Sequence, residues 1–156
     1  MRKKLIPPYF EHMKLLLVDA GDVLRPRMVD ALSEIEGVEV SAGAQGADGA
    51  LLLTLGSLPD VVVVDIQMVR GALDLVRAIK SISHPPIVIT LSSSSSIWYR
   101  AACHNAGAEL FFDKVREQLR LVEAVEDLQK ELGSRSVENG AAGDSSSKRE
   151  KKEVRK

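Results

Sequence analysis

Two aspartates each end a run of apolar residues, which is a pattern that can bring two carboxylates together. Asp19 follows the apolar residues 15–18, and Asp65 follows four consecutive valines at 61–64. The carboxyl ends of parallel strands lie along one edge of a sheet, where α/β proteins form their ligand crevice. Two carboxylates placed close together repel each other unless one pKa rises or a cation neutralises them. A hard cation such as Mg²⁺ suits this pair, because it accepts one or two carboxylates and also binds phosphate oxygens.

Three further side chains with suitable chemistry follow the next apolar runs. Thr90 and Ser92 lie at the end of the run 87–91, and Lys114 follows the run 110–112. An aspartate can accept a phosphoryl group covalently. An ammonium and a hydroxyl group can then bind the other phosphoryl oxygens. Taken singly, an aspartate here is an ordinary helix cap and a lysine an ordinary surface residue, so the prediction of a site rests on their joint occurrence.

The segments that must position these residues alternate between two kinds. Short β-branched runs predict strands, and segments with apolar residues at helical spacing predict helices. Alternation of this kind indicates a parallel sheet with helices on both faces. The expected strands are residues 15–19, 38–40, 61–65, 87–91 and 110–112, and the expected helices are residues 25–36, 47–55, 73–82, 97–106 and 121–132.

Composition places the chain among globular proteins with a single domain. The 156 residues are 45% apolar and 28% charged, and the net charge of −1 gives no general attraction to nucleic acid or membrane. A single cysteine fits the reducing cytoplasm, and no apolar stretch reaches the length of a membrane span. We expect a short lead-in at residues 1–13, one domain at 14–132 and a disordered charged tail at 133–156. The sequence shows no helix-turn-helix pattern, so it gives no reason to expect nucleic-acid binding.

Three stretches of the chain, taken together, resemble the receiver domain of bacterial two-component response regulators. The resemblance covers about residues 14–132. It implies a flavodoxin-like (βα)5 three-layer sandwich with a central five-stranded parallel sheet in the order 2-1-3-4-5. The matching stretches are Leu15–Asp19, Pro59–Met68 and Ala106–Lys114.

The same resemblance implies a role for each candidate residue. The phosphoacceptor falls on Asp65, and Mg²⁺ would be held by Asp19, by Asp65 and by the backbone carbonyl of Gln67. The phosphate-binding lysine falls on Lys114. The switch hydroxyl falls on Thr90 or Ser92, with Thr90 preferred. The switch aromatic on the last strand falls on Phe111.

The function expected from this resemblance is that of a stand-alone response regulator in the cytoplasm. A histidine kinase or phosphotransfer protein would phosphorylate Asp65, and the chain would catalyse no reaction beyond its own phosphorylation and dephosphorylation. The signal would leave through a downstream protein partner or a homodimer. The surface used would be the face made by the helix 97–106, the strand 110–112 and the last helix.

Several departures from the family pattern support other hypotheses. Ala20 stands where the family has a second acid, and Val69 and Val115 replace two prolines. A degenerate receiver that binds a partner without phosphorylation is therefore the alternative. A more remote alternative is a phosphatase of the haloacid dehalogenase type. Residues 18–24 resemble the nucleophile motif of those enzymes, although Gly21 stands where the motif has its second acid.

Overall fold

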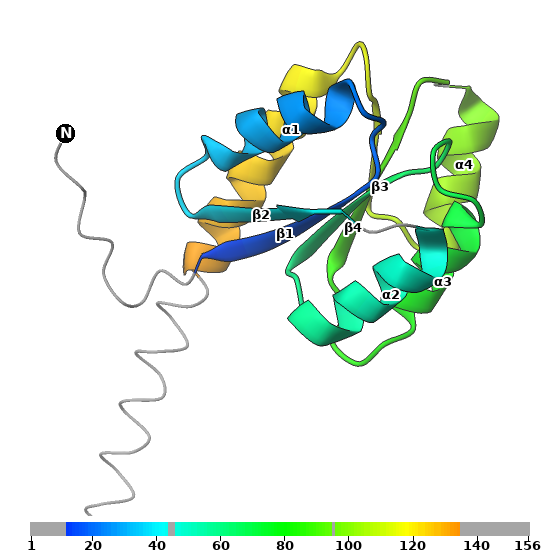
Figure 1. Ribbon diagram of the computed structural model, residues 1–156, viewed down its shortest axis with the longest axis horizontal. Coiled ribbons are helices and arrows are strands. Elements are labelled where there is room, and N and C mark those ends of the chain that lie inside the picture. Colours follow the sequence, from blue (N-terminus) through cyan, green and yellow to red (C-terminus); the bar gives the residue numbers. More distant parts are fainter. Residues whose placement is uncertain (1–11, 44–45, 95, 135–156) are drawn as a thin grey trace, which may run out of the picture.

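The central feature of the computed structural model is a parallel sheet. The structure describes residues 12–43, 46–94 and 96–134, and within them five strands lie in the order β2-β1-β3-β4-β5 (Figure 1). All four strand pairs are parallel, so the predicted flavodoxin-like topology is confirmed. The strands are β1 (Met13–Val18), β2 (Val38–Ala42), β3 (Val61–Asp65), β4 (Ile87–Ser92) and β5 (Leu110–Asp113).

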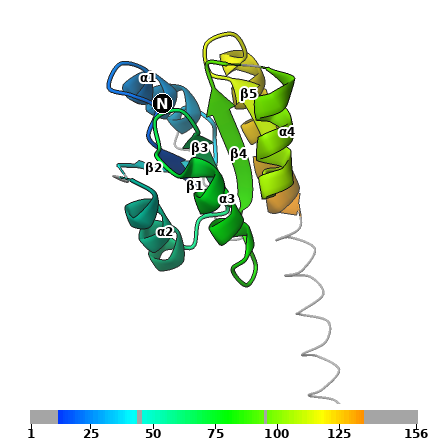
Figure 2. The same ribbon diagram turned by 90° about the vertical axis from the view of Figure 1, so that its right-hand side faces the viewer.

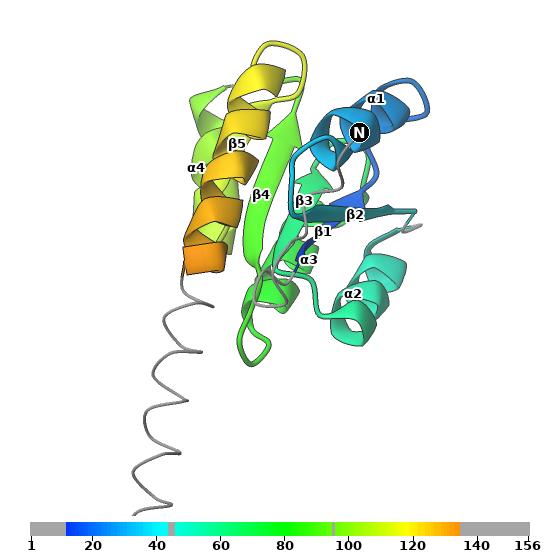
Figure 3. The same cartoon turned by 90° about the vertical axis from the view of Figure 1, so that its left-hand side faces the viewer.

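Helices cover both faces of this sheet and complete the three layers. One face carries α1 and the final helix (residues 118–134), and the other carries α2, α3 and α4, as the two turned views show (Figures 2 and 3). In the described part of the chain, no helix is long and apolar enough to cross a membrane. The labelled helices are α1 (Leu24–Ser33), α2 (Gly46–Ser57), α3 (Ala72–Lys80) and α4 (Ile97–Ala106).

The middle strand β3 is buried along its whole length because it has packed helices on both sides. Its side chains alternate between two cores, as the period of two residues in a strand requires. Val61 and Val63 pack under α1 and the final helix, whereas Val62 and Val64 pack under α2, α3 and α4. A four-valine run is therefore needed to fill both layers, and this explains why the sequence shows no polar alternation here.

The ends of several elements differ slightly from the sequence-based expectation. Gly56, expected to follow the second helix, lies inside α2. Gly107 does follow α4, with a left-handed φ of 111°. Residues 1–11 of the expected lead-in and residues 135–156 of the expected tail lie outside the described residues, and residues 133 and 134 still belong to the final helix.

The register of the strands determines which residues reach the carboxyl edge of the sheet. Asp65 pairs with Leu91, and Ser92 pairs with Asp113. The last residues of β3, β4 and β5 therefore end at nearly the same level. Asp19 directly follows β1, whose Val18 pairs with Val64. The fold thus brings the ends of four strands to one edge.

Truncating a side chain in the core under α3 should destabilise the protein strongly. Ile79 has no exposed surface, so Ile79→Ala should lower the free energy of unfolding by about 2–5 kcal/mol through lost burial and a cavity. The control, Leu52→Ala on α2, removes the side chain of an exposed residue and should change stability by about 0.5 kcal/mol or less. Urea unfolding measures both. Equal effects of the two substitutions would contradict the described packing.

Candidate functional site

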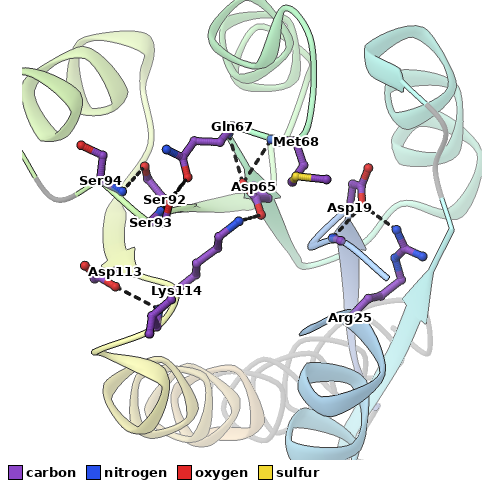
Figure 4. A network of polar contacts seen from close by, with 12 residues as sticks. Asp19, Arg25, Asp65, Gln67, Met68, Ser92, Ser93, Ser94, Asp113 and Lys114 are labelled. Atoms are coloured by element: carbon purple, nitrogen blue, oxygen red, sulfur yellow. Dashed lines mark hydrogen bonds and ion pairs between the residues drawn. The ribbon is translucent and has the colours of Figure 1, made fainter. Parts of the chain in front are cut away.

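The site is built around the carboxylate of Asp65, which has no exposed surface. Its Oδ1 accepts hydrogen bonds from the backbone amides of Gln67, at 3.1 Å, and Met68, at 3.3 Å. Its Oδ2 accepts one from Lys114 Nζ at 2.9 Å (Figure 4). One oxygen is thus held by the turn after β3, and the other is held by the ammonium of Lys114, whose side chain is 14% exposed.

Lys114 is positioned by the end of β5. Its backbone amide donates to the carbonyl of Ser92 at 3.0 Å, which ties it to the end of β4. The Asp113 carboxylate accepts the amides of Val115 and Arg116, both at 2.9 Å, and so closes the turn that follows. These amides, Arg116 first, lower the pKa of Asp113. The ammonium of Lys114 therefore comes from a rigid turn and reaches Asp65 across β4, the strand between β3 and β5.

Asp19 forms a second ion pair on the β1 side of the site. It has a left-handed φ of 39°, and its Oδ1 accepts the amide of Gly21 at 2.9 Å and Arg25 Nη2 at 2.5 Å. The Gly21 amide, followed by Arg25 and Lys114, lowers the pKa of Asp19. Arg25 was not among the residues expected from sequence. The sequence did contain an indication of this pair, because Arg25 follows Asp19 by six residues and lies near the start of α1.

The residues present offer little to a divalent metal ion. Receiver domains generally bind Mg²⁺, which requires an octahedral set of oxygen ligands. In the part of the chain that the structure describes, no group of three or more His, Cys, Asp or Glu residues could hold a metal. Asp19 is paired with Arg25, and Asp65 with Lys114. Ala20, where the family has an acid, is buried and apolar. The side chains therefore do not fit a metal centre.

The side chain of Gln67 connects two loops over the site. Its Oε1 accepts hydrogen bonds from the amide of Ser93 at 2.8 Å and from its hydroxyl at 2.5 Å. The turn after β3 is thereby fastened to the residue that follows β4. The contribution of Gln67 seen here comes from its side chain. The predicted use of its backbone carbonyl as a metal ligand stays a prediction.

The structure separates the two candidate switch hydroxyls. Thr90 pairs with Val64, one level below Asp65. Its hydroxyl donates to the carbonyl of Leu110 at 3.2 Å, and its side chain is fully buried. Ser92 is the last residue of β4, and its Oγ accepts the amide of Ser94 at 3.0 Å. Ser92 is as fully buried as Thr90 and lies one residue beyond the level of Asp65, at the end of β4. Which of the two hydroxyls acts as the switch stays a prediction.

In the serine run of residues 92–96, the described members have specific contacts. Besides Ser92 and Ser93, Ser96 is the N-cap of α4, with its Oγ accepting the amide of Tyr99 at 3.4 Å. Such a cap satisfies one of the free amides at the start of a helix. Described serines of this run thus lie both at the site, at Ser92 and Ser93, and at the start of α4, at Ser96.

Phe111 lies on β5 and is half-buried against the core under α4. The guanidinium of Arg100 lies 4.7 Å from the centre of its ring, and Arg100 also pairs with Glu117 at 2.9 Å. Nearby, Trp98 is 82% exposed. The face formed by α4, β5 and the start of the final helix thus combines exposed aromatic surface with a cation–π contact.

Comparison with known proteins gives consistent results. The model of the response regulator receiver domain matches residues 15–126. No curated protein matches the sequence. A solved receiver domain of the putative response regulator NarL from Mycobacterium tuberculosis is 28% identical, with a TM-score of 0.69. The match covers 77% of this chain and 98% of that one.

Two more distant structures show the same fold. The receiver domain of a putative Luxo repressor protein from Vibrio parahaemolyticus has 20% identity and a TM-score of 0.69, over 81% of this chain and 96% of the other. The response regulator domain of Thermotoga maritima CheB has 18% identity and a TM-score of 0.64, over 78% and 96%. The matched family is the receiver domain, so the resemblance of residues 18–24 to a phosphatase motif gains no support.

The carboxylates around the site should make stability depend on acid pH. Hydrogen bonds to their charged forms lower the pKa values of Asp19, Asp113 and Glu117, the last through the Asp113 amide. A lowered folded-state pKa contributes stability that is present above the ordinary values of 3.8 and 4.5 and is lost as pH falls. The urea midpoint should therefore be level between about pH 7 and 5 and fall below about pH 4.5.

Asp113→Asn is the variant that tests this cause. It should lower the urea midpoint at neutral pH and make the fall in acid smaller, since one of the contributing carboxylates is gone. Asp30→Asn, at an exposed position on α1, is the control and should keep the wild-type fall. If the Asp113 variant follows the wild-type curve at every pH, the turn after β5 does not stabilise the charged carboxylate.

Proposed function

Because this chain belongs to the family of response regulator receiver domains, we propose that it accepts a phosphoryl group on Asp65 and passes the signal to a protein partner. The observation that supports this best is the buried ion pair between Asp65 Oδ2 and Lys114 Nζ. In this pair, the Asp65 carboxylate is the nucleophile, and the Lys114 ammonium is the cation that would neutralise the phosphoryl group after transfer. Receiver domains are typically not classical enzymes, so the chemistry proposed is limited to phosphorylation and dephosphorylation of Asp65 itself.

The proposed transfer begins at the oxygen that Lys114 holds. A receiver domain implies a histidine kinase, and the donor is its phosphohistidine or that of a phosphotransfer protein. Asp65 Oδ2 attacks the phosphorus, a P–O bond forms and the P–N bond breaks. The electron pair of the broken bond returns to the imidazole nitrogen, which then takes a proton. The amides of Gln67 and Met68 hold Oδ1 in place, so that the attacking oxygen is oriented in advance.

The product carries extra negative charge that nearby groups must neutralise. Lys114 is already within hydrogen-bond distance of the attacking oxygen and moves with it to the phosphoryl group. We propose Ser92 as the switch hydroxyl, since it lies at the end of β4 and bonds through its carbonyl to the Lys114 amide. Drawing these two residues together pulls on the serine run that leads to α4. Hydrolysis by water then returns the Asp65 carboxylate and inorganic phosphate.

The signal would leave through the face formed by α4, β5 and the start of the final helix. Apolar side chains are exposed on this face, at Ile97, Trp98, Val115 and Leu119. Exposed aromatic and aliphatic residues grouped in this way are typical of protein contacts. We propose a downstream protein or a second copy as the partner, and a cytoplasmic location, where receiver domains typically act.

A second function is favoured by one observation, the pairing of both site carboxylates with cations in a region where Ala20 replaces an acid. A receiver of this kind can bind its partner without phosphorylation. In that case the chain gains no phosphoryl group from any donor, and Asp65→Asn binds the partner as tightly as wild type. The phosphatase alternative would instead require turnover of a phosphate ester that is lost in Asp19→Asn.

Incubation with a small phosphodonor such as phosphoramidate should add one phosphoryl group to the protein, measured by intact mass. Asp65→Asn should gain nothing. Lys114→Ala should be phosphorylated more slowly, by about tenfold or more, because one preorganised cation is removed. The emission of Trp98 serves as a second signal, since the serine run links the site to α4.

The matched control for these variants is Asp22→Asn, which removes a nearby carboxylate whose side chain is 99% exposed. It should be phosphorylated like wild type. An equal mass gain in wild type and Asp65→Asn would exclude Asp65 as the acceptor. No gain in any protein would leave the phosphorylation-independent module as the function.

A further inference from the structure

The second ion pair of the site shows an unusual feature, a protein cation in the place next to Asp19. Arg25 Nη2 lies 2.5 Å from Asp19 Oδ1. The side chain of Arg25 is 32% exposed and that of Asp19 is 26% exposed, so most of both is covered by the protein. Arg25 Nη1 also approaches Asp22 at 3.5 Å, but Asp22 is a solvated side chain. Figure 4 shows this pair on the β1 side of the site and the Asp65–Lys114 pair on the other. Each acid therefore has its own cation.

The same geometry works against a divalent ion. The Asp19 oxygen that binds Arg25 already accepts the Gly21 amide. The Met68 side chain reaches toward this loop, since a Cβ placed on Gly21 would lie 3.7 Å from Met68 Cε. A thioether is a soft group that Mg²⁺ does not choose. A guanidinium a few ångströms away would repel a second cation even in high dielectric.

We propose that Arg25 is a built-in cation that takes the place of a divalent metal beside Asp19, so that phosphorylation of Asp65 does not need Mg²⁺. The exclusion of the metal rests on the Arg25–Asp19 pair and its surroundings, and not on the proposed function. The effect on phosphorylation rests on the function proposed above.

The chemistry of a guanidinium suits this role. It stays charged at all relevant pH values and presents several donors in a rigid plane. A phosphoryl group on Asp65 would replace the single negative charge of the carboxylate with about 1.5 to 2 negative charges close to Asp19. Lys114 contacts Asp65 directly, and Arg25 lies beyond Asp19 and neutralises it, so each of the two acids has a positive charge beside it when this increase occurs. Asp19 is then a positioning residue, since it anchors Arg25 at the edge of the site.

The first experiment measures Mg²⁺ binding by calorimetry on the intact chain. Wild type should show no binding at millimolar Mg²⁺, whereas Arg25→Ala should bind Mg²⁺ measurably in this range, because the repelling charge is gone and Asp19 is released. Arg25→Lys keeps the charge and should behave like wild type. Arg27→Ala, which removes an exposed arginine of the same helix, is the matched control and should also show no binding.

The second experiment compares phosphorylation by phosphoramidate in Mg²⁺ and in EDTA. Wild type and Arg27→Ala should gain the same mass at the same rate in both, while Arg25→Ala should become dependent on Mg²⁺. A wild-type protein that binds millimolar Mg²⁺, or whose phosphorylation is lost in EDTA, would overturn the proposal. So would an Arg25→Ala variant that binds no better than wild type.

The two experiments separate this inference from the proposed function. If neither wild type nor any variant is phosphorylated in Mg²⁺ or in EDTA, Asp65 is not a phosphoacceptor. The Mg²⁺ titration then still decides whether Arg25 excludes the metal. If Arg25→Ala does not fold, as judged by circular dichroism, the wild-type titration together with the wild-type comparison in EDTA decides the question.

Discussion

A carboxylate without exposed surface must find its partners inside the fold, and the edge of this sheet is arranged around that requirement at Asp65. Two backbone amides and the Lys114 ammonium satisfy its oxygens. Burying such a pair costs desolvation, so it stabilises only when its hydrogen bonds are well made. The pair also joins β3 to β5 across β4. Any chemistry at Asp65 that shifts Lys114 therefore acts on two strand ends and on the loops between them.

Much of this arrangement could be predicted from the sequence, because it follows from local patterns. The valine run before Asp65 requires burial on both faces, and burial of this kind is typical of the middle of a parallel sheet. Parallel strands then bring Asp19, Asp65 and Lys114 to one edge. The two helical layers follow from the same alternation, whereas the strand order 2-1-3-4-5 was implied by the resemblance to receiver domains. The positions at which the chain ends its helices were less certain, as Gly56 inside α2 shows.

Other parts of the site depend on geometry that no local pattern contains. The left-handed conformation of Asp19 turns the chain so that Arg25 returns to it, and non-glycine residues adopt this conformation too rarely to be expected. The difference between Thr90 and Ser92 depends on strand register. Both lie on the same strand face, so only pairing with β3 and β5 separates them. The exposure of Trp98 depends on what α4 leaves uncovered, which is a property of the whole layer.

The central claim is that Asp65 is the acceptor and that its phosphorylation uses cations of the protein itself. Borohydride reduction of the phosphorylated chain converts an aspartyl phosphate to homoserine, and peptide mass spectrometry locates the modified residue. Homoserine is expected at position 65 in a sample phosphorylated in EDTA. Homoserine at position 19, or at position 65 only when Mg²⁺ is present, would contradict it.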